Sequence, residues 1–112
     1  MLGGLPNPDR AILGIDKLRD YCLNSQHSEG RHKARVFASA LGLTQQDAER
    51  LRTAILGALP LAPAIKRGTT VFGDRFSADI DVERHDRCAT VRTCWIIRVD
   101  EDVPRLVTCF VL

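Results

Sequence analysis

The spacing of the hydrophobic residues changes at 60-PLAP-63, and this change most constrains the fold. Before it, apolar residues recur at i, i+3, i+4 and i+7, as on one face of a helix: Ala34, Phe37, Ala38 and Leu41. After it, they alternate with polar residues, as on one face of a strand: Phe76, Ala78, Ile80 and Val82. Helices followed by strands predict an α+β fold, with about three N-terminal helices packed on one face of a three- to four-stranded antiparallel meander.

Helix-ending and helix-starting residues divide the first half into segments. Asp16 is expected to cap a short helix that ends near Asn24. A second helix is predicted over residues 31–42, with the glycine at its end as the stop signal. Residues 44–47 resemble a capping box that opens a third helix, and Pro60 is expected to end it.

The second half predicts strands over residues 64–71, 75–83, 88–99 and 105–111. A two-residue turn at His85-Asp86 would make the middle strands a hairpin. In that register Asp79 stands opposite Arg92, and a slip by one residue would separate the apolar faces. The polar face of the sheet would then pair acids with arginines.

Length and composition indicate an ordinary globular protein. The 112 residues fit a single domain, 1–112, and 45% are hydrophobic while 27% are charged. The start shows neither a secretion signal nor a membrane-spanning run, so we expect a cytoplasmic protein with no membrane partner.

The cysteines lack metal-site spacing. No C-x-x-C pair occurs, so we expect no metal and no cofactor, and reduced cysteines that pack as small hydrophobic residues. They are Cys22, Cys88, Cys94 and Cys109.

The stretch 27-HSEGRHKAR-35 concentrates imidazole and cationic groups at a predicted helix start, where the helix dipole also attracts anions. Cleavage of RNA without metal needs a base for the 2'-hydroxyl, an acid for the leaving oxygen and cations for the phosphorane charge. His32 or His27 could transfer the protons. Lys33, Arg31 or Arg92 could stabilise the charge. The cluster is therefore a candidate ribonuclease site.

Simpler interpretations of these residues stay open. The basic side chains could form a solvated helix face, with His32 bound to a backbone carbonyl, and Arg92 could simply pair with an acid. Thr93 and Thr108 could hydrogen-bond a substrate phosphate or each other across neighbouring strands. Trp95 is more typical of core packing than of base stacking.

Several segments together resemble a family of small bacterial domains of unknown function (DUF6883-like). The resemblance spans nearly the whole chain, and its segments are 7-NPDRAILGIDKLRDYCLN-24, 27-HSEGRHKARVFASALG-42, 90-TVRTCWII-97 and 103-VPRLVT-108. Such members look like C-terminal modules of contact-dependent or phage-borne toxins, or like stand-alone proteins beside small partner genes. The order of elements is similar to that of the barnase, EndoU, colicin and RelE group of metal-independent ribonucleases. The residues that this resemblance assigns to a site are His27, His32, Lys33, Arg92, Thr93 and Thr108.

Three functional hypotheses follow. The first is a toxin-type ribonuclease that cleaves RNA by attack of its own 2'-hydroxyl, with a small immunity or antitoxin protein as a further partner. The alternative is a non-catalytic protein-binding module, either toxin-neutralising or phage-associated, in which the basic helix start docks an acidic surface. The third is RNA binding without turnover, although the sequence offers few exposed aromatic residues for stacking.

Overall fold

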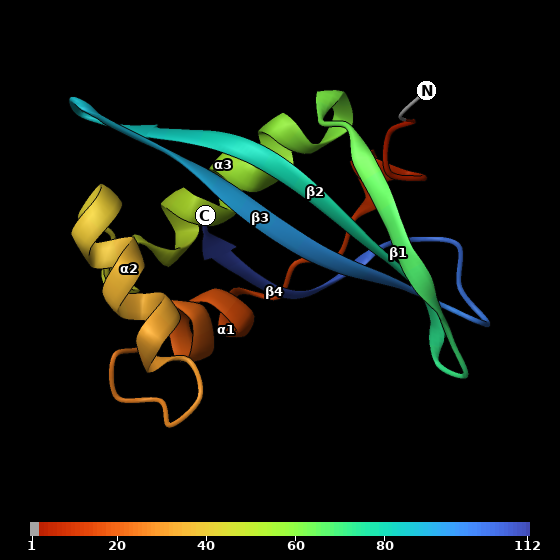
Figure 1. Cartoon of the computed structure of the whole chain (residues 1–112), viewed down its shortest axis with the longest axis horizontal. Helices are drawn as coiled ribbons and strands as arrows, with labels where there is room; N and C mark the ends of the chain where they lie inside the picture. Colours follow the sequence, from red (N-terminus) through yellow and green to blue (C-terminus); the bar gives the residue numbers. More distant parts are fainter. Residues whose placement is uncertain (1–2) are drawn as a thin grey trace.

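The computed structural model describes residues 3–112, in which helices are followed by an antiparallel sheet (Figure 1). The helical elements are η1 (Pro8–Arg10), α1 (Ile15–Lys17), η2 (Leu18–Cys22), α2 (Arg31–Leu41), η3 (Gln45–Asp47), α3 (Ala48–Ala58) and η4 (Leu59–Leu61). The strands are β1 (Ala64–Thr70), β2 (Gly73–Arg84), β3 (Arg87–Arg98) and β4 (Arg105–Val111). The predicted α+β class is confirmed.

The sheet is a four-stranded meander in the order β1-β2-β3-β4, with every neighbouring pair antiparallel. The turn at His85 and Asp86 joins β2 to β3, and Asp79 stands opposite Arg92 as predicted. Two irregularities interrupt the pairing. Arg67 of β1 and Val107 of β4 are each an extra residue without a partner in the register.

The second and third helices follow the predicted signals. Gly42 ends α2 in the left-handed conformation, with φ 67°. Thr44 and Asp47 form the capping box before α3, in which the Asp47 carboxylate accepts hydrogen bonds from the Thr44 backbone N–H and hydroxyl. Arg84 at the end of β2 contacts Asp47 at 3.2 Å and also donates to the Gly42 carbonyl. The turn between α2 and α3 is therefore fastened to the sheet.

The first helix differs from the prediction at its start. Gly14, not Asp16, is the N-cap, and Asp16 lies inside the first turn of α1. A Cβ at position 14 would lie 2.6 Å from the Asp16 carboxylate, so glycine makes room for that acid. The helix then widens into the π-helical η2, where the Leu23 N–H donates to the Leu18 carbonyl at 2.8 Å.

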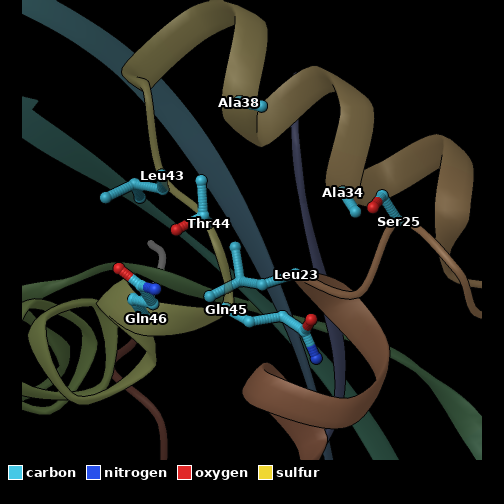
Figure 2. Close-up of a pocket in the computed structure, with 8 residues that line it drawn as sticks. All are labelled: Leu23, Ser25, Ala34, Ala38, Leu43, Thr44, Gln45 and Gln46. Carbon is cyan, nitrogen blue, oxygen red and sulfur yellow. The ribbon is translucent and has the colours of Figure 1, made fainter.

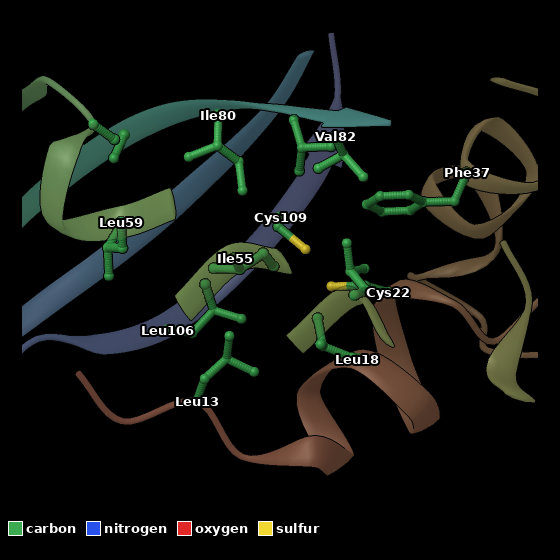
Figure 3. Close-up of a cluster of buried hydrophobic side chains, with 14 of the residues drawn as sticks. Leu13, Leu18, Cys22, Phe37, Ile55, Leu59, Ile80, Val82, Leu106 and Cys109 are labelled. Atoms are coloured by element: carbon green, nitrogen blue, oxygen red, sulfur yellow. The ribbon is translucent and has the colours of Figure 1, made fainter. Parts of the chain in front are cut away.

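The core lies between the helices and one face of the sheet (Figure 3). Phe37 from α2, Ile55 from α3 and Trp95 from β3 are all fully buried there. Burial of each large apolar side chain contributes about 1.5–3 kcal/mol. Cys22 and Cys109 lie in the same cluster with free thiols, as expected for small hydrophobic residues.

The two edge strands of the sheet, β4 and β1, differ in how far other segments cover them. Ile12 forms a parallel bridge with Arg105 of β4, and α1 and α2 lie along the β4 side of the sheet (Figure 1). The outer strand β1 is exposed from Ile65 to Thr70. In the described part of the chain no helix is long and apolar enough to cross a membrane.

Candidate functional site

A line of polar side chains crosses the sheet on the face that the core does not use. Ser77, Cys94 and Thr108 are register partners on β2, β3 and β4. Arg67 of β1 donates from Nε to Ser77 Oγ at 2.7 Å. At the opposite end, Lys33 of α2 donates from Nζ to Thr108 Oγ1 at 3.1 Å. We call this set the polar row.

Lys33 occupies the junction between α2 and the edge of β4. Its ammonium also donates to the Tyr21 hydroxyl at 2.9 Å and lies 4.8 Å from the centroid of that ring. The Phe110 ring centroid lies 6.0 Å away. An ammonium group has three N–H donors, and these two hydrogen bonds leave one for a ligand. Lys33 is thus held in place and keeps a donor for an anion.

Arg92 lies next to the polar row on β3. Its guanidinium binds Asp79 through two parallel hydrogen bonds, from Nε at 2.9 Å and from Nη2 at 3.0 Å. This contact lowers the pKa of Asp79 below its ordinary value, although burial acts in the opposite direction. The ion pair fixes the guanidinium in one orientation on the sheet.

Three cations and one carboxylate influence the Cys94 thiol. Burial raises the pKa of this thiol. The positive charges of Arg92, Lys33 and Arg67 act in the opposite direction, and the Asp79 carboxylate acts in the same direction as burial. The three cations come from β3, α2 and β1, which are separate segments of the chain.

His27 is held by the loop before α2. Its Nδ1 accepts hydrogen bonds from the backbone N–H groups of Glu29 and Gly30, both at 3.0 Å. The ring also stands edge-on to Tyr21, with centroids 4.9 Å apart. Because Nδ1 is an acceptor, the ring proton is assigned to Nε2. In this arrangement the loop backbone engages His27 Nδ1, and Nε2–H is the ring group that can donate a hydrogen bond to a ligand.

His32 is exposed in the first turn of α2. Together with Lys33, it borders a shallow hollow of about 320 Å³ whose other walls are Val36, Phe110 and Val111. Lys33 therefore connects the surroundings of His32 with the polar row.

Thr93 and Arg31 do not join this arrangement. Thr93 is fully buried on the core face, where its hydroxyl donates to the Ala78 carbonyl at 2.6 Å and accepts from Trp95 Nε1 at 2.8 Å. The Thr93 side chain has no exposed surface through which it could reach the substrate phosphate considered from the sequence. Arg31 is exposed at the start of α2.

A second depression lies on the α1 side of Lys33. This cleft of about 490 Å³ is lined by Tyr21, His27 and Thr108, and also by Lys17 and three carboxylates. Those carboxylates belong to Asp16, Asp20 and Glu29. They would repel a phosphate, so an anion is better placed on the sheet side of Lys33.

Figure 2 shows a further pocket of about 430 Å³, between α2 and the segment that leads into α3. Its lining is uncharged and includes Ala34, Ala38 and Gln45. The helical repeat places these alanines on the side of α2 away from His32 and Val36. Without an ionisable lining residue, this pocket cannot supply acid–base chemistry.

The described residues, 3–112, contain no cluster of three or more His, Cys, Asp or Glu side chains that could hold a metal ion.

Arg67 and Tyr21 were not predicted from the sequence as site residues. Arg67 is the bulged residue of β1, and a bulge re-aims a side chain in a way that alternation does not show. Tyr21 shares a helix face with buried Leu18 and Cys22, which indicated a core residue. A tyrosine on such a face can bury its ring and still present its hydroxyl at the protein surface. This property of tyrosine was the only signal in the sequence that Tyr21 could belong to a site.

Comparisons with known proteins identify the chain at the level of a family. The model described as "Domain of unknown function (DUF6883)" matches residues 4–112. No match was found among curated proteins or among solved structures. The match covers almost the entire chain, which confirms the family predicted from sequence. The chain therefore belongs to the DUF6883 family of domains of unknown function.

Proposed function

We propose that this domain is a metal-independent ribonuclease of the toxin type, which acts on RNA in the cytoplasm by attack of the RNA's own 2'-hydroxyl. One observation carries the proposal: Lys33 binds Thr108 at one end of the polar row, Arg67 binds Ser77 at the other end, and Arg92 lies next to the row on β3. The cations come from separate elements, and exposed His32 lies beside Lys33. This combination supplies charge stabilisation and a proton-transfer group.

The scissile phosphate would bind on the sheet face against the remaining Lys33 donor and the Arg92 guanidinium. His32 removes the proton from the 2'-hydroxyl as that oxygen forms its bond to phosphorus. The bond from phosphorus to the 5'-oxygen then breaks, and the protonated imidazole returns a proton to that oxygen. The products are a 2',3'-cyclic phosphate and a free 5'-hydroxyl, so atoms and protons balance.

The other predicted residues have supporting roles. Thr108 holds Lys33 in position through its hydroxyl. His27 can donate from Nε2 but does not serve as the base. Arg31 adds positive charge at the exposed start of α2, where it attracts the RNA backbone.

Purified protein incubated with total RNA in EDTA tests the proposal. Wild type should degrade the RNA, and His32→Ala should reduce the rate about 10²- to 10⁴-fold. Lys33→Gln should reduce it about 10²- to 10³-fold. Arg35→Gln removes the same charge from an exposed position on α2 and should leave the rate near wild type. Intact RNA at high wild-type concentration would contradict the proposal.

A second candidate function is a protein-binding module that neutralises a toxin or serves a phage-associated complex. It is favoured by exposed apolar side chains at one end of the sheet, in the β1–β2 turn and just after β3. Val71 and Phe72 form that turn, and the Val99 N–H donates to the Phe72 carbonyl at 3.3 Å. Neighbouring exposed apolar groups of this kind are typical of interaction sites.

The two functions predict different results for Phe72→Ser. As a binding module, the protein should retain a co-encoded partner in a pull-down, lose it with Phe72→Ser, and leave RNA intact. Retention that is unchanged by Phe72→Ser would remove the support for this surface. RNA cleavage that is unaffected by Phe72→Ser would favour the ribonuclease.

A further inference from the structure

The hollow beside His32 is lined mainly by apolar side chains, which binding of a phosphate alone does not require. Val36, Phe110 and Val111 form apolar walls, while His32 and Lys33 lie at the border. Val36 is 43% exposed, on a helix that buries Ala34, Phe37 and Leu41. An apolar floor next to basic groups matches a nucleotide, which has an apolar flat ring and an anionic phosphate.

We propose that this hollow is a nucleobase subsite, in which an unpaired base of the RNA stacks on the Phe110 ring. The proposal rests on the proposed ribonuclease function and names its substrate class as single-stranded RNA. In an RNA duplex the bases are stacked and paired, so their faces cannot reach an aromatic side chain in a surface hollow. An unpaired base presents its face freely.

The position of Phe110 connects the subsite to the cations. Phe110 is the register partner of Arg92, so the two side chains project from neighbouring strands on one face. Its ring centroid lies 6.0 Å from Lys33 Nζ. A base on this ring would leave its phosphate near Lys33 and Arg92. Its ribose would lie towards His32, which shares the hollow.

The volume of the hollow limits its occupant. About 320 Å³ is enough for one base with its ribose, but the open shape offers no room to enclose a longer segment. The other depressions fit a nucleotide less well, since the cleft beside Tyr21 carries carboxylates and the pocket in Figure 2 has no charged lining residue. One base is therefore the occupant that the lining favours.

Titration of the wild-type protein with uridine 3'-monophosphate and adenosine 3'-monophosphate, followed by NMR amide shifts, tests the subsite. Phe110→Leu should weaken binding of these nucleotides about 5- to 150-fold, the range expected for loss of one stacked base. Inorganic phosphate should bind Phe110→Leu as it binds wild type. Phe72→Leu, which changes an exposed aromatic side chain in the β1–β2 turn, is the matched control.

A second variant separates loss of the subsite from loss of folding. Val36→Glu changes an exposed position, keeps Phe110, and places a negative charge at the hollow. It should weaken nucleotide binding while the thermal unfolding midpoint stays near wild type. Nucleotide binding that is no tighter than that of inorganic phosphate, or that is unchanged in both variants, would overturn the subsite.

Failure of the subsite can be distinguished from failure of the ribonuclease proposal. Nucleotide binding that depends on Phe110, in a protein that never cleaves RNA, would keep the subsite and remove the enzyme. Cleavage of single-stranded RNA with an unchanged KM in Phe110→Leu would keep the enzyme and remove the subsite. A substrate preference for double-stranded RNA would also overturn the subsite.

Discussion

The two faces of β3 differ in their residues and in their exposure to solvent. On the covered face, Val91, Thr93 and Trp95 are buried against the helices. On the open face, Arg92 and Cys94 are partly exposed, Arg92 pairs with Asp79, and Cys94 lies between Ser77 and Thr108 in the polar row. The covered face satisfies its polar groups internally, whereas the open face keeps donors available. One strand thus separates the residues that hold the fold from the residues that can meet a ligand.

The two threonines of the neighbouring strands illustrate this difference. The Thr93 hydroxyl donates to one core group and accepts from another, so it has no function left outside the core. The Thr108 hydroxyl accepts from Lys33 and lies 3.7 Å from Cys22 Sγ at the border of the polar row. The two threonines have different hydrogen-bond partners because the strands present them on opposite faces.

Trp95→Ala should give the largest effect on stability. Removing the fully buried indole leaves a cavity and is expected to reduce the free energy of unfolding by about 3–5 kcal/mol. Urea denaturation would measure this. Val99→Ala, at a position 75% exposed, should change the same quantity by about 0.5 kcal/mol or less. A small effect of Trp95→Ala would mean that the covered face is not the main source of stability.

Replacing each threonine by valine compares the faces directly. Thr93→Val leaves Trp95 Nε1 without its acceptor and should cost about 1–3 kcal/mol of stability. Thr108→Val should affect stability less, but should slow RNA cleavage about 5-fold because Lys33 loses a partner worth about 1 kcal/mol. The reverse pattern, with Thr93→Val slowing cleavage in a stable protein, would refute the division between faces.

The affinity for RNA should depend on salt through cations on the open face of the sheet. Affinity for a single-stranded RNA should fall as salt rises, and each phosphate contact contributes about 0.7 to the slope of log K against log salt. Lys33→Gln should therefore reduce the slope by about 0.7, as measured by fluorescence anisotropy with an EDTA-containing buffer. Arg50→Gln, exposed on α3, should leave the slope unchanged. Equal effects of both variants would indicate diffuse attraction without a defined site.

The pH dependence of the Asp79–Arg92 pair should be the smallest effect. The contact lowers the pKa of Asp79 in the folded protein below the ordinary aspartate value of about 3.9. The stability that it contributes is present above that value and is lost as the pH falls through the lower folded pKa. Unfolding curves of wild type and Asp79→Asn should therefore differ slightly at neutral pH and converge in acid. A difference that grows in acid would contradict the pairing.

Much of the fold follows from local sequence patterns. The start and end of α2, the capping box at Thr44 and the register of Asp79 with Arg92 were predicted correctly. Each depends on residues close in sequence or on a two-residue turn, so neighbouring side chains decide the outcome. The prediction of Asp16 as a cap was wrong because Gly14 makes room for its carboxylate inside the turn.

The site was less predictable because it depends on bulges and on long-range packing. The extra residue Val107 interrupts alternation in β4, so that Leu106 and Cys109 both reach the core and Thr108 pairs with Cys94 on the other face. Arg67 is likewise displaced by a bulge. The sequence identified Lys33 and Arg92 as cations, but only the packing of α2 against β4 brings Lys33 to Thr108, on the strand next to the one that carries Arg92. The roles of His32, Lys33 and Arg92 in catalysis remain predictions.

The hydrogen bond between Lys33 and Thr108 joins residues 75 positions apart. A ribosome completes α2 well before it synthesises β4, so Lys33 stays without its Thr108 partner until both segments have been made. Any activity that depends on this contact would begin only after translation has passed residue 108.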